Sequence, residues 1–364
     1  VQESGFQPSD KPITVDNVVA NAKLAEMAKA QHPRILATYG GEYSDPKLER
    51  MVAKVVGNLT VVSANPTQTY RITILNSPNV NAFALPGGYL YVTRGLLALA
   101  NDSSELAAVI AHEMGHVTAN HGLQRQQLEA EEGLARNFGP PGVGTRDRDA
   151  FLAGIDGLLY GDTPEEGYVR GQTFMHPNLG VSFTVPDGFV IDNSAAAVTA
   201  TGPGDIAIRF DGVAIDKSVS LTDYIRSGWV AGLEDASVRQ ETINGNEAAM
   251  AHANAQGWQF DIAVIRAGGQ VYRLLTAAPS ASASLDPVAR SVSGSFRVLS
   301  PAEKAALKPL HIRVVTVQAG QTMGSLAAQM VGVDRKLDLF RVLNAMSPGA
   351  SVSAGDKVKI VTDK

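Results

Sequence analysis

The chain has 364 residues, of which 45% are hydrophobic and 18% are charged. This balance is typical of a globular protein and excludes an intrinsically disordered chain. The length predicts two or three domains, and the net charge of −5 argues against a broad nucleic-acid-binding surface. Cysteine is absent, so disulfides and cysteine nucleophiles are excluded and any metal must be held by His, Asp or Glu. No apolar run reaches the roughly 18–20 residues of a membrane-spanning helix.

The first 120 residues predict helices around a small sheet. Apolar spacing predicts helices over residues 15–30 and 47–58. Strand patterns at 71–75, 80–85 and 89–93 predict the sheet, and Pro86-Gly87-Gly88 forms a tight turn between the last two. A short helix over 94–99 precedes a helix start signal at 101–105, after which a helix is expected through residue 120.

This last helix carries the motif H-E-x-x-H at residues 112–116. His112 and His116 are one helical turn apart, so their imidazoles share a face and can hold one Zn²⁺. Glu113 can take a proton from a zinc-activated water and deliver it to a leaving amine. A chance match is expected only about 0.01 times in a chain of this composition, which favours the catalytic interpretation over two structural histidines.

The stretches 81–97 and 105–117 resemble peptidase family M48, the gluzincin-type zinc metallopeptidases that include HtpX-related and BepA-like periplasmic proteases. The resemblance covers roughly residues 10–130. It implies one zinc per chain, a protein or peptide substrate, and an edge strand beside the metal. The strand residues are Asn81, Ala82, Phe83 and Ala84. A substrate would add a strand to this edge through backbone pairing.

The family's third zinc ligand, a glutamate on a later helix, has no match at its expected place. Only 22 residues separate His116 from the Gly139 linker. Glu129 is one candidate, but on a continuous helix it would lie about 20 Å from His116, so it would need the chain to reverse near Gly122. We favour the alternative that a segment near 132–137 is missing from the domain that spans residues 1–138.

Two further domains are expected after a linker and connecting helix at 139–171. Residues 172–305 alternate strands with helices at 221–231 and 284–292, and this order resembles a PsbP-like antiparallel α+β domain. We expect Trp229, Trp258 and Phe260 in its core, and His176-Pro177 at the start of its first strand. No catalytic constellation is visible in this region.

Residues 311–364 resemble a LysM module, with matching stretches at 315–327, 339–344 and 352–360. The resemblance implies a strand–helix–helix–strand fold that binds N-acetylglucosamine glycans such as peptidoglycan. Gln321 replaces the family's usual Asp, and Met323 and Gly324 are unusual there. A purely structural module therefore remains the alternative to a sugar-binding one.

The sequence thus predicts a multidomain α+β protein with a mainly helical zincin-type domain, a PsbP-like domain and a LysM-like βααβ module. We expect a periplasmic or envelope-associated zinc endopeptidase that acts on misfolded or unassembled proteins, with no nucleic-acid partner and no transmembrane segment. Because the chain starts at Val1 without a signal sequence, we expect a trimmed N-terminus. The alternative is an envelope binding or assembly factor with an inactive or autoinhibited metallopeptidase domain.

Overall fold

The computed structural model describes the backbone of residues 15–63, 66–118, 147–194 and 197–364, with side chains except at 15–25 and 116–118. It divides into two compact units. The first comprises Val1–Ala37 and Gly41–Gly154, and the second comprises Thr38–Gly40 and Ile155–Lys364. Predicted features at residues 119–146, including Glu129 and the suspected gap near 132–137, lie outside the described residues.

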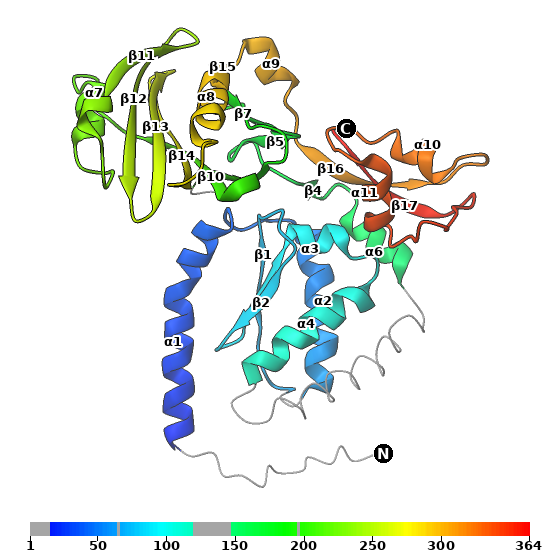
Figure 1. Cartoon of the computed structure of the whole chain (residues 1–364). Helices are drawn as coiled ribbons and strands as arrows, with labels where there is room; N and C mark the ends of the chain where they lie inside the picture. Colours follow the sequence, from blue (N-terminus) through cyan, green and yellow to red (C-terminus); the bar gives the residue numbers. More distant parts are fainter. Residues whose placement is uncertain (1–14, 64–65, 119–146, 195–196) are drawn as a thin grey trace, which may run out of the picture. The chain divides into compact units, whose positions relative to one another are not determined.

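The first unit places helices around a three-stranded sheet (Figure 1). The helices are α1 (Val15–Thr38), α2 (Pro46–Val62), α3 (Arg94–Leu99), α4 (Ser103–Thr118) and α6 (Arg148–Ile155). The sheet has the order β1 (Arg71–Leu75), β3 (Tyr89–Thr93), β2 (Ala82–Leu85), with β1 parallel and β2 antiparallel to β3. The predicted strands and the helix at 94–99 are therefore present, and β2 is an edge strand.

Local chemistry explains where the second helix begins. Asp45 accepts hydrogen bonds from the amides of Lys47 (2.9 Å) and Leu48 (3.2 Å), and Pro46 occupies the first turn. Both features favour a helix N-terminus. Val52 and Leu59 are among the residues that α2 buries, so one apolar face fixes this helix in the unit's core.

The second unit is built on a seven-stranded antiparallel sheet. Its order is β11 (Arg239–Ile243), β12 (Asn246–Ala255), β13 (Trp258–Ala267), β14 (Gln270–Pro279), β10 (Ile206–Val213), β9 (Val198–Gly202) and β8 (Val190–Asn193). A four-stranded sheet has the order β15 (Arg297–Val298), β7 (Val181–Thr184), β6 (Thr173–His176) and β5 (Tyr168–Arg170). The antiparallel α+β pattern predicted for this region is present.

Both faces of the large sheet are covered. One face packs with α8 (Leu285–Ser295) and the small sheet around aromatic rings, and Phe210 lies 4.8 Å from Phe183 and 5.5 Å from Tyr272, centroid to centroid. The other face packs against α7 (Leu221–Arg226). Because α7 ends at Arg226, it is shorter than the helix predicted over 221–231.

The two tryptophans, Trp229 and Trp258, differ in how far they are buried. Trp229 packs against the apolar cluster under α7 and donates its indole N–H to the Tyr224 carbonyl at 3.1 Å. Phe260 packs against the same cluster. Trp258 stands at the start of β13 with 38% of its surface exposed, so its predicted core position is wrong.

The C-terminal residues have the predicted strand–helix–helix–strand order. The elements are β16 (Leu310–Thr316), α10 (Met323–Ala327), α11 (Lys336–Leu343) and β17 (Lys357–Thr362), and β16 pairs antiparallel with β17. The buried Asn344 side chain donates to the carbonyls of Phe340 and Lys359 and accepts the Lys359 amide at 2.7 Å. Asn344 thus ties α11 to β17. The short helix α9 (Pro301–Ala306) precedes this module in the chain.

The segment before the small sheet also contributes structure. β4 (Leu159–Tyr160) pairs antiparallel with β16, which gives a three-stranded sheet of order β17-β16-β4. Two residues from the expected linker region therefore complete the sheet of the C-terminal module. In the described residues no helix is long and apolar enough to cross a membrane.

Candidate active site

The H-E-x-x-H motif lies on α4, as predicted. The helix buries one continuous face through Leu106, Ala107, Ile110, Ala111 and Met114, all at most 4% exposed. His112 is exposed on another face and Glu113 is half-buried. The apolar face fixes the helix in the core, and the first motif histidine is left accessible to a ligand or substrate.

The start of α4 is held by reciprocal hydrogen bonds. Asp102 accepts from the Glu105 amide at 2.9 Å, and the Glu105 carboxylate accepts from the Asn101 amide at 2.8 Å. This pattern satisfies helix N-terminal amides as a capping box does. Asp147, just before α6, accepts from both the amide and the hydroxyl of Ser103. These contacts fix the register of the motif helix, whereas the sequence pattern indicates only its start signal.

The edge strand β2 is anchored at one end by a threonine. The Thr93 hydroxyl donates to the Asn81 carbonyl (2.9 Å) and accepts from the amides of Asn81 (3.0 Å) and Leu96 (3.3 Å). Thr93 therefore caps α3 and holds the residue before β2 at once. Thr93 lies in the stretch 81–97 that resembles the family, but its sequence position alone does not reveal this role.

Aromatic packing fixes the middle of the same hairpin. Phe83 of β2 stacks on its cross-strand partner Tyr91 at 4.9 Å between centroids. Tyr91 is fully buried, and its hydroxyl lies 2.8 Å from Nδ1 of His32 on α1. His32 therefore has a structural role, and α4 packs directly against β2. Of the four predicted substrate-strand residues, Ala82, Phe83 and Ala84 lie on β2 and Asn81 immediately precedes it.

The donor set suits a zinc ion in type and spacing. His112 and His116 lie on one helix four residues apart, where two imidazoles can reach the same metal. Among the described side chains, no cluster of three or more His, Asp or Glu is placed to hold a metal. The side chain of His116 and the candidate third ligand Glu129 are not among those described. The assignment of the ligands therefore stays a prediction.

His176 is engaged in a structural role. It ends β6 rather than opening the first strand, and it is buried. Its Nδ1 accepts the Leu179 amide at 3.2 Å, so Nε2 carries the proton and donates to the Glu165 carbonyl at 3.0 Å. Burial lowers the pKa of His176 despite the hydrogen bond to Glu165. The neutral ring is thus fixed in one tautomer.

A helix that carries H-E-x-x-H beside the edge strand of a small sheet is the arrangement expected of a zincin-type metallopeptidase domain. Residues 42–136 match the model of peptidase family M48. The resemblance read from the sequence is therefore confirmed.

Two curated relatives are each similar to part of the chain. The β-barrel assembly-enhancing protease of Yersinia pestis is 32% identical over 152 residues, which is 40% of this chain and 31% of that protein. Mitochondrial metalloendopeptidase OMA1 of Schizosaccharomyces pombe is 30% identical over 101 residues, 27% of this chain and 30% of that protein. The chain thus spans about a third of the length of these relatives.

A solved structure is similar to part of the chain at a low level. Cyanobacterial PsbP from Synechocystis superposes with a TM-score of 0.26 at 13% identity, covering 38% of this chain and 98% of that one. This score is too low to support an argument about the fold. The PsbP-like assignment of 172–305, the LysM assignment of 311–364 and the domain boundaries stay predictions.

Proposed function

We propose that the protein is a zinc-dependent endopeptidase of the bacterial cell envelope. The observation that carries this proposal is the H-E-x-x-H motif on α4, where His112 is exposed, next to the edge strand β2. His112 and His116, with a third carboxylate ligand, would hold Zn²⁺. When bound, the ion supplies Lewis-acid polarisation of the substrate carbonyl and activates water near neutral pH.

Proton transfer and substrate alignment would be performed by residues of the chain itself. Glu113, adjacent to the first ligand, takes the proton of the attacking water and passes it to the leaving amine as the peptide bond breaks. β2 aligns an extended substrate by backbone pairing along its open edge. An extended substrate implies an unfolded or unassembled protein, because backbone in a folded protein is already paired.

We also propose a cellular location, a class of substrates and a glycan partner. The Yersinia relative is named for assembly of β-barrels, which supports a periplasmic or envelope-associated location and unassembled envelope proteins as substrates. We propose peptidoglycan as a partner of residues 311–364, on the strength of the LysM resemblance. The βααβ element order supports that assignment.

Substitution of the general base tests the mechanism. Glu113→Gln should lower cleavage of unfolded casein by about 10²–10⁴-fold while zinc content, measured by mass spectrometry, stays near that of the parent protein. Glu26→Gln, on the exposed surface of α1, is the matched control and should cleave normally. Retained turnover in the Glu113 variant would refute the mechanism. Peptidoglycan binding without metal-dependent cleavage by the parent protein would favour the binding-factor alternative.

A further inference from the structure

A basic pocket of about 450 Å³ lies between α2 and α6 of the first unit. Its floor is apolar, because Val55 and Phe151 are at most 2% exposed and Met51 is half-buried. The volume is within the range of ligand-binding pockets, which is about 300–1,000 Å³. None of its lining residues belongs to the H-E-x-x-H motif or to β2, so the proposed hydrolysis does not account for this pocket.

Three cations border the floor of the basic pocket on the α2 side. Lys47, Arg50 and Lys54 follow one another at steps of three and four residues, so they share one face of the helix. All three side chains are exposed, and within the described residues none of them is paired with a carboxylate. Asp147, the carboxylate among the lining residues, accepts instead from the amide and the hydroxyl of Ser103. The pocket therefore has an excess of unpaired positive charge.

This arrangement of cations reduces the stability of α2 when nothing is bound. Like charges three or four residues apart on a helix repel each other. Lys47 also lies in the first turn of α2, where a cation opposes the helix dipole. The chain as a whole has a net charge of −5, so the local excess of cations is not a consequence of composition. An anionic ligand would relieve both kinds of repulsion.

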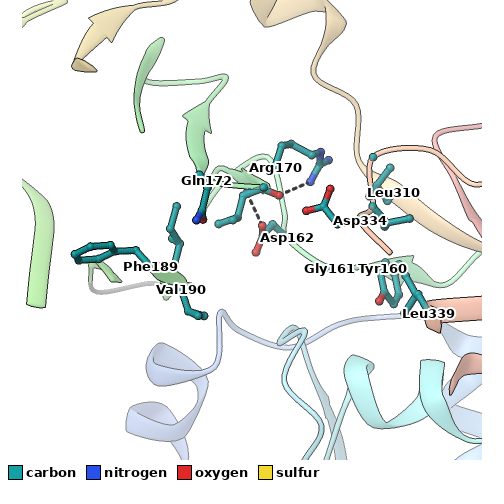
Figure 2. A pocket seen from close by; sticks show the side chains of 15 residues that line it. Tyr160, Gly161, Asp162, Arg170, Gln172, Phe189, Val190, Leu310, Asp334 and Leu339 are labelled. Carbon is teal, nitrogen blue, oxygen red and sulfur yellow. Dashed lines mark hydrogen bonds between the residues drawn. The ribbon is translucent and has the colours of Figure 1, made fainter. Parts of the chain in front are cut away.

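A pocket of the second unit has the opposite balance of charge. Figure 2 shows Asp162 and Asp334 together with Arg170 in its lining, and its volume is about 650 Å³. Arg170 already donates to the carbonyls of Val169 (3.1 Å) and Lys308 (3.3 Å). An acidic ligand would meet two carboxylates there, whereas in the basic pocket it would meet three unpaired cations.

The spacing of the cations favours a polypeptide over a single headgroup as the ligand. With a rise of 1.5 Å per residue, the steps from Lys47 to Arg50 and from Arg50 to Lys54 are about 4.5 Å and about 6 Å along the helix axis. Carboxylates at steps of three and four residues on a second helix repeat this spacing. A lipid headgroup concentrates its charge at one point, whereas the three cations are spread over about 10 Å.

We propose that the basic pocket docks an acidic amphipathic helix of a partner polypeptide. Acidic residues at steps of three and four would pair with Lys47, Arg50 and Lys54, and apolar residues of the same helix would contact Met51. The small side chain of Ala153, which is exposed on α6, leaves room for a second helix to approach. This docking goes beyond the proposed hydrolysis, because it requires neither zinc nor the general base.

Fluorescence anisotropy with a designed helical peptide tests the proposal. The probe is a fluorescein-labelled, alanine-rich peptide with glutamate at alternating steps of three and four residues and leucine beside each glutamate. The full chain carries Glu113→Gln so that the probe stays intact. Lys54→Glu should weaken binding about tenfold, because it replaces an attraction by a repulsion. Lys29→Glu is the matched control, because Lys29 is an exposed lysine on the helix α1 and does not line the pocket.

A second pair of variants tests contact with the pocket rather than charge. Ala153→Gln adds bulk at an exposed lining position without changing the charge, and should weaken binding at least about fivefold. Ala53→Gln, at an exposed position of α2 outside the pocket, should leave binding unchanged. Equal effects of these two substitutions would mean that the helix does not enter the pocket, and would overturn the proposal.

Two other ligands distinguish the helix from simple attraction to negative charge. A peptide of the same composition with glutamate at every second position should bind about tenfold more weakly, because its carboxylates do not share one helical face. Vesicles of phosphatidylglycerol and phosphatidylcholine should not bind through Lys54. The proposal is wrong if the respaced peptide binds as tightly as the probe, or if Lys54→Glu and Lys29→Glu have equal effects. It is also wrong if Lys54→Glu weakens binding of the vesicles but not of the helical probe.

Discussion

The hydroxyl of Thr93 offers a direct test of how the edge strand is held. Replacing Thr93 by valine preserves the shape of this fully buried side chain but removes its three hydrogen bonds. The Leu96 amide then loses its helix cap, and the Asn81 amide loses its acceptor at 3.0 Å. The Asn81 carbonyl keeps the Thr93 amide as a donor at 3.0 Å.

The expected cost follows from these contacts. Loss of an N-cap costs about 1 kcal/mol, and loss of one partly buried hydrogen bond costs about 1 kcal/mol more. The free energy of opening β2 and α3 should therefore fall by about 2 kcal/mol, which raises the open population roughly thirtyfold.

Hydrogen–deuterium exchange of peptides that cover residues 80–99 measures this opening directly. Thr60→Val is the matched control, because Thr60 is also buried in the first unit but donates only to the Val56 carbonyl of its own helix, at 2.7 Å. Its effect should stay below about 1 kcal/mol. If exchange in β2 and α3 is no faster in the Thr93 variant than in the Thr60 variant, the anchoring role of Thr93 is wrong.

Two further predictions concern backbone packing and pH. Gly95→Ala should destabilise the first unit by about 2 kcal/mol, because the new Cβ would lie 2.0 Å from the Pro78 carbonyl oxygen. Gly57→Ala, on α2 with open space around it, should instead stabilise by up to about 1 kcal/mol; amide exchange compares the two, and equal effects would refute the reasoning. Burial lowers the folded-state pKa of His176. As the pH falls, the His176 imidazole is therefore protonated in the unfolded state before it is protonated in the folded state, and the free energy of unfolding decreases below about pH 6.5. His176→Gln should remove up to about 1.4 kcal/mol per pH unit of that slope in urea unfolding followed by tryptophan fluorescence, and an unchanged slope would contradict the assignment.

Elements with a strong local pattern could be predicted from the sequence. The strand Arg71–Leu75 has the predicted bounds, and the motif helix begins at the expected cap. β12 (Asn246–Ala255) was not predicted, because its alanine-rich sequence lacks the β-branched residues that mark a strand. Its alanines at 248, 249, 251 and 253 are nearly fully buried between neighbouring strands, so tertiary packing decides its conformation.

The candidate site was predictable to the extent that its residues are close in sequence. His112, Glu113 and His116 are linked by helical spacing alone, and β2 follows from a hairpin pattern. The anchoring of Asn81 by Thr93 and of Ser103 by Asp147 joins residues 12 and 44 positions apart, which no periodicity reveals. The pocket of about 650 Å³ lined by residues of β5, β8 and the C-terminal module depends on elements that meet only in the tertiary structure.

The pairing of β4 with β16 has a consequence for how the C-terminal module can be handled. A fragment that begins at residue 311 would lack Leu159 and Tyr160 and would leave one side of β16 open. Open strand edges recruit other chains, so such a fragment should self-associate more readily than the full chain. A fragment in which both sides of β16 are paired has to start before residue 159. The C-terminal module therefore depends on a segment that precedes it in the chain by about 150 residues.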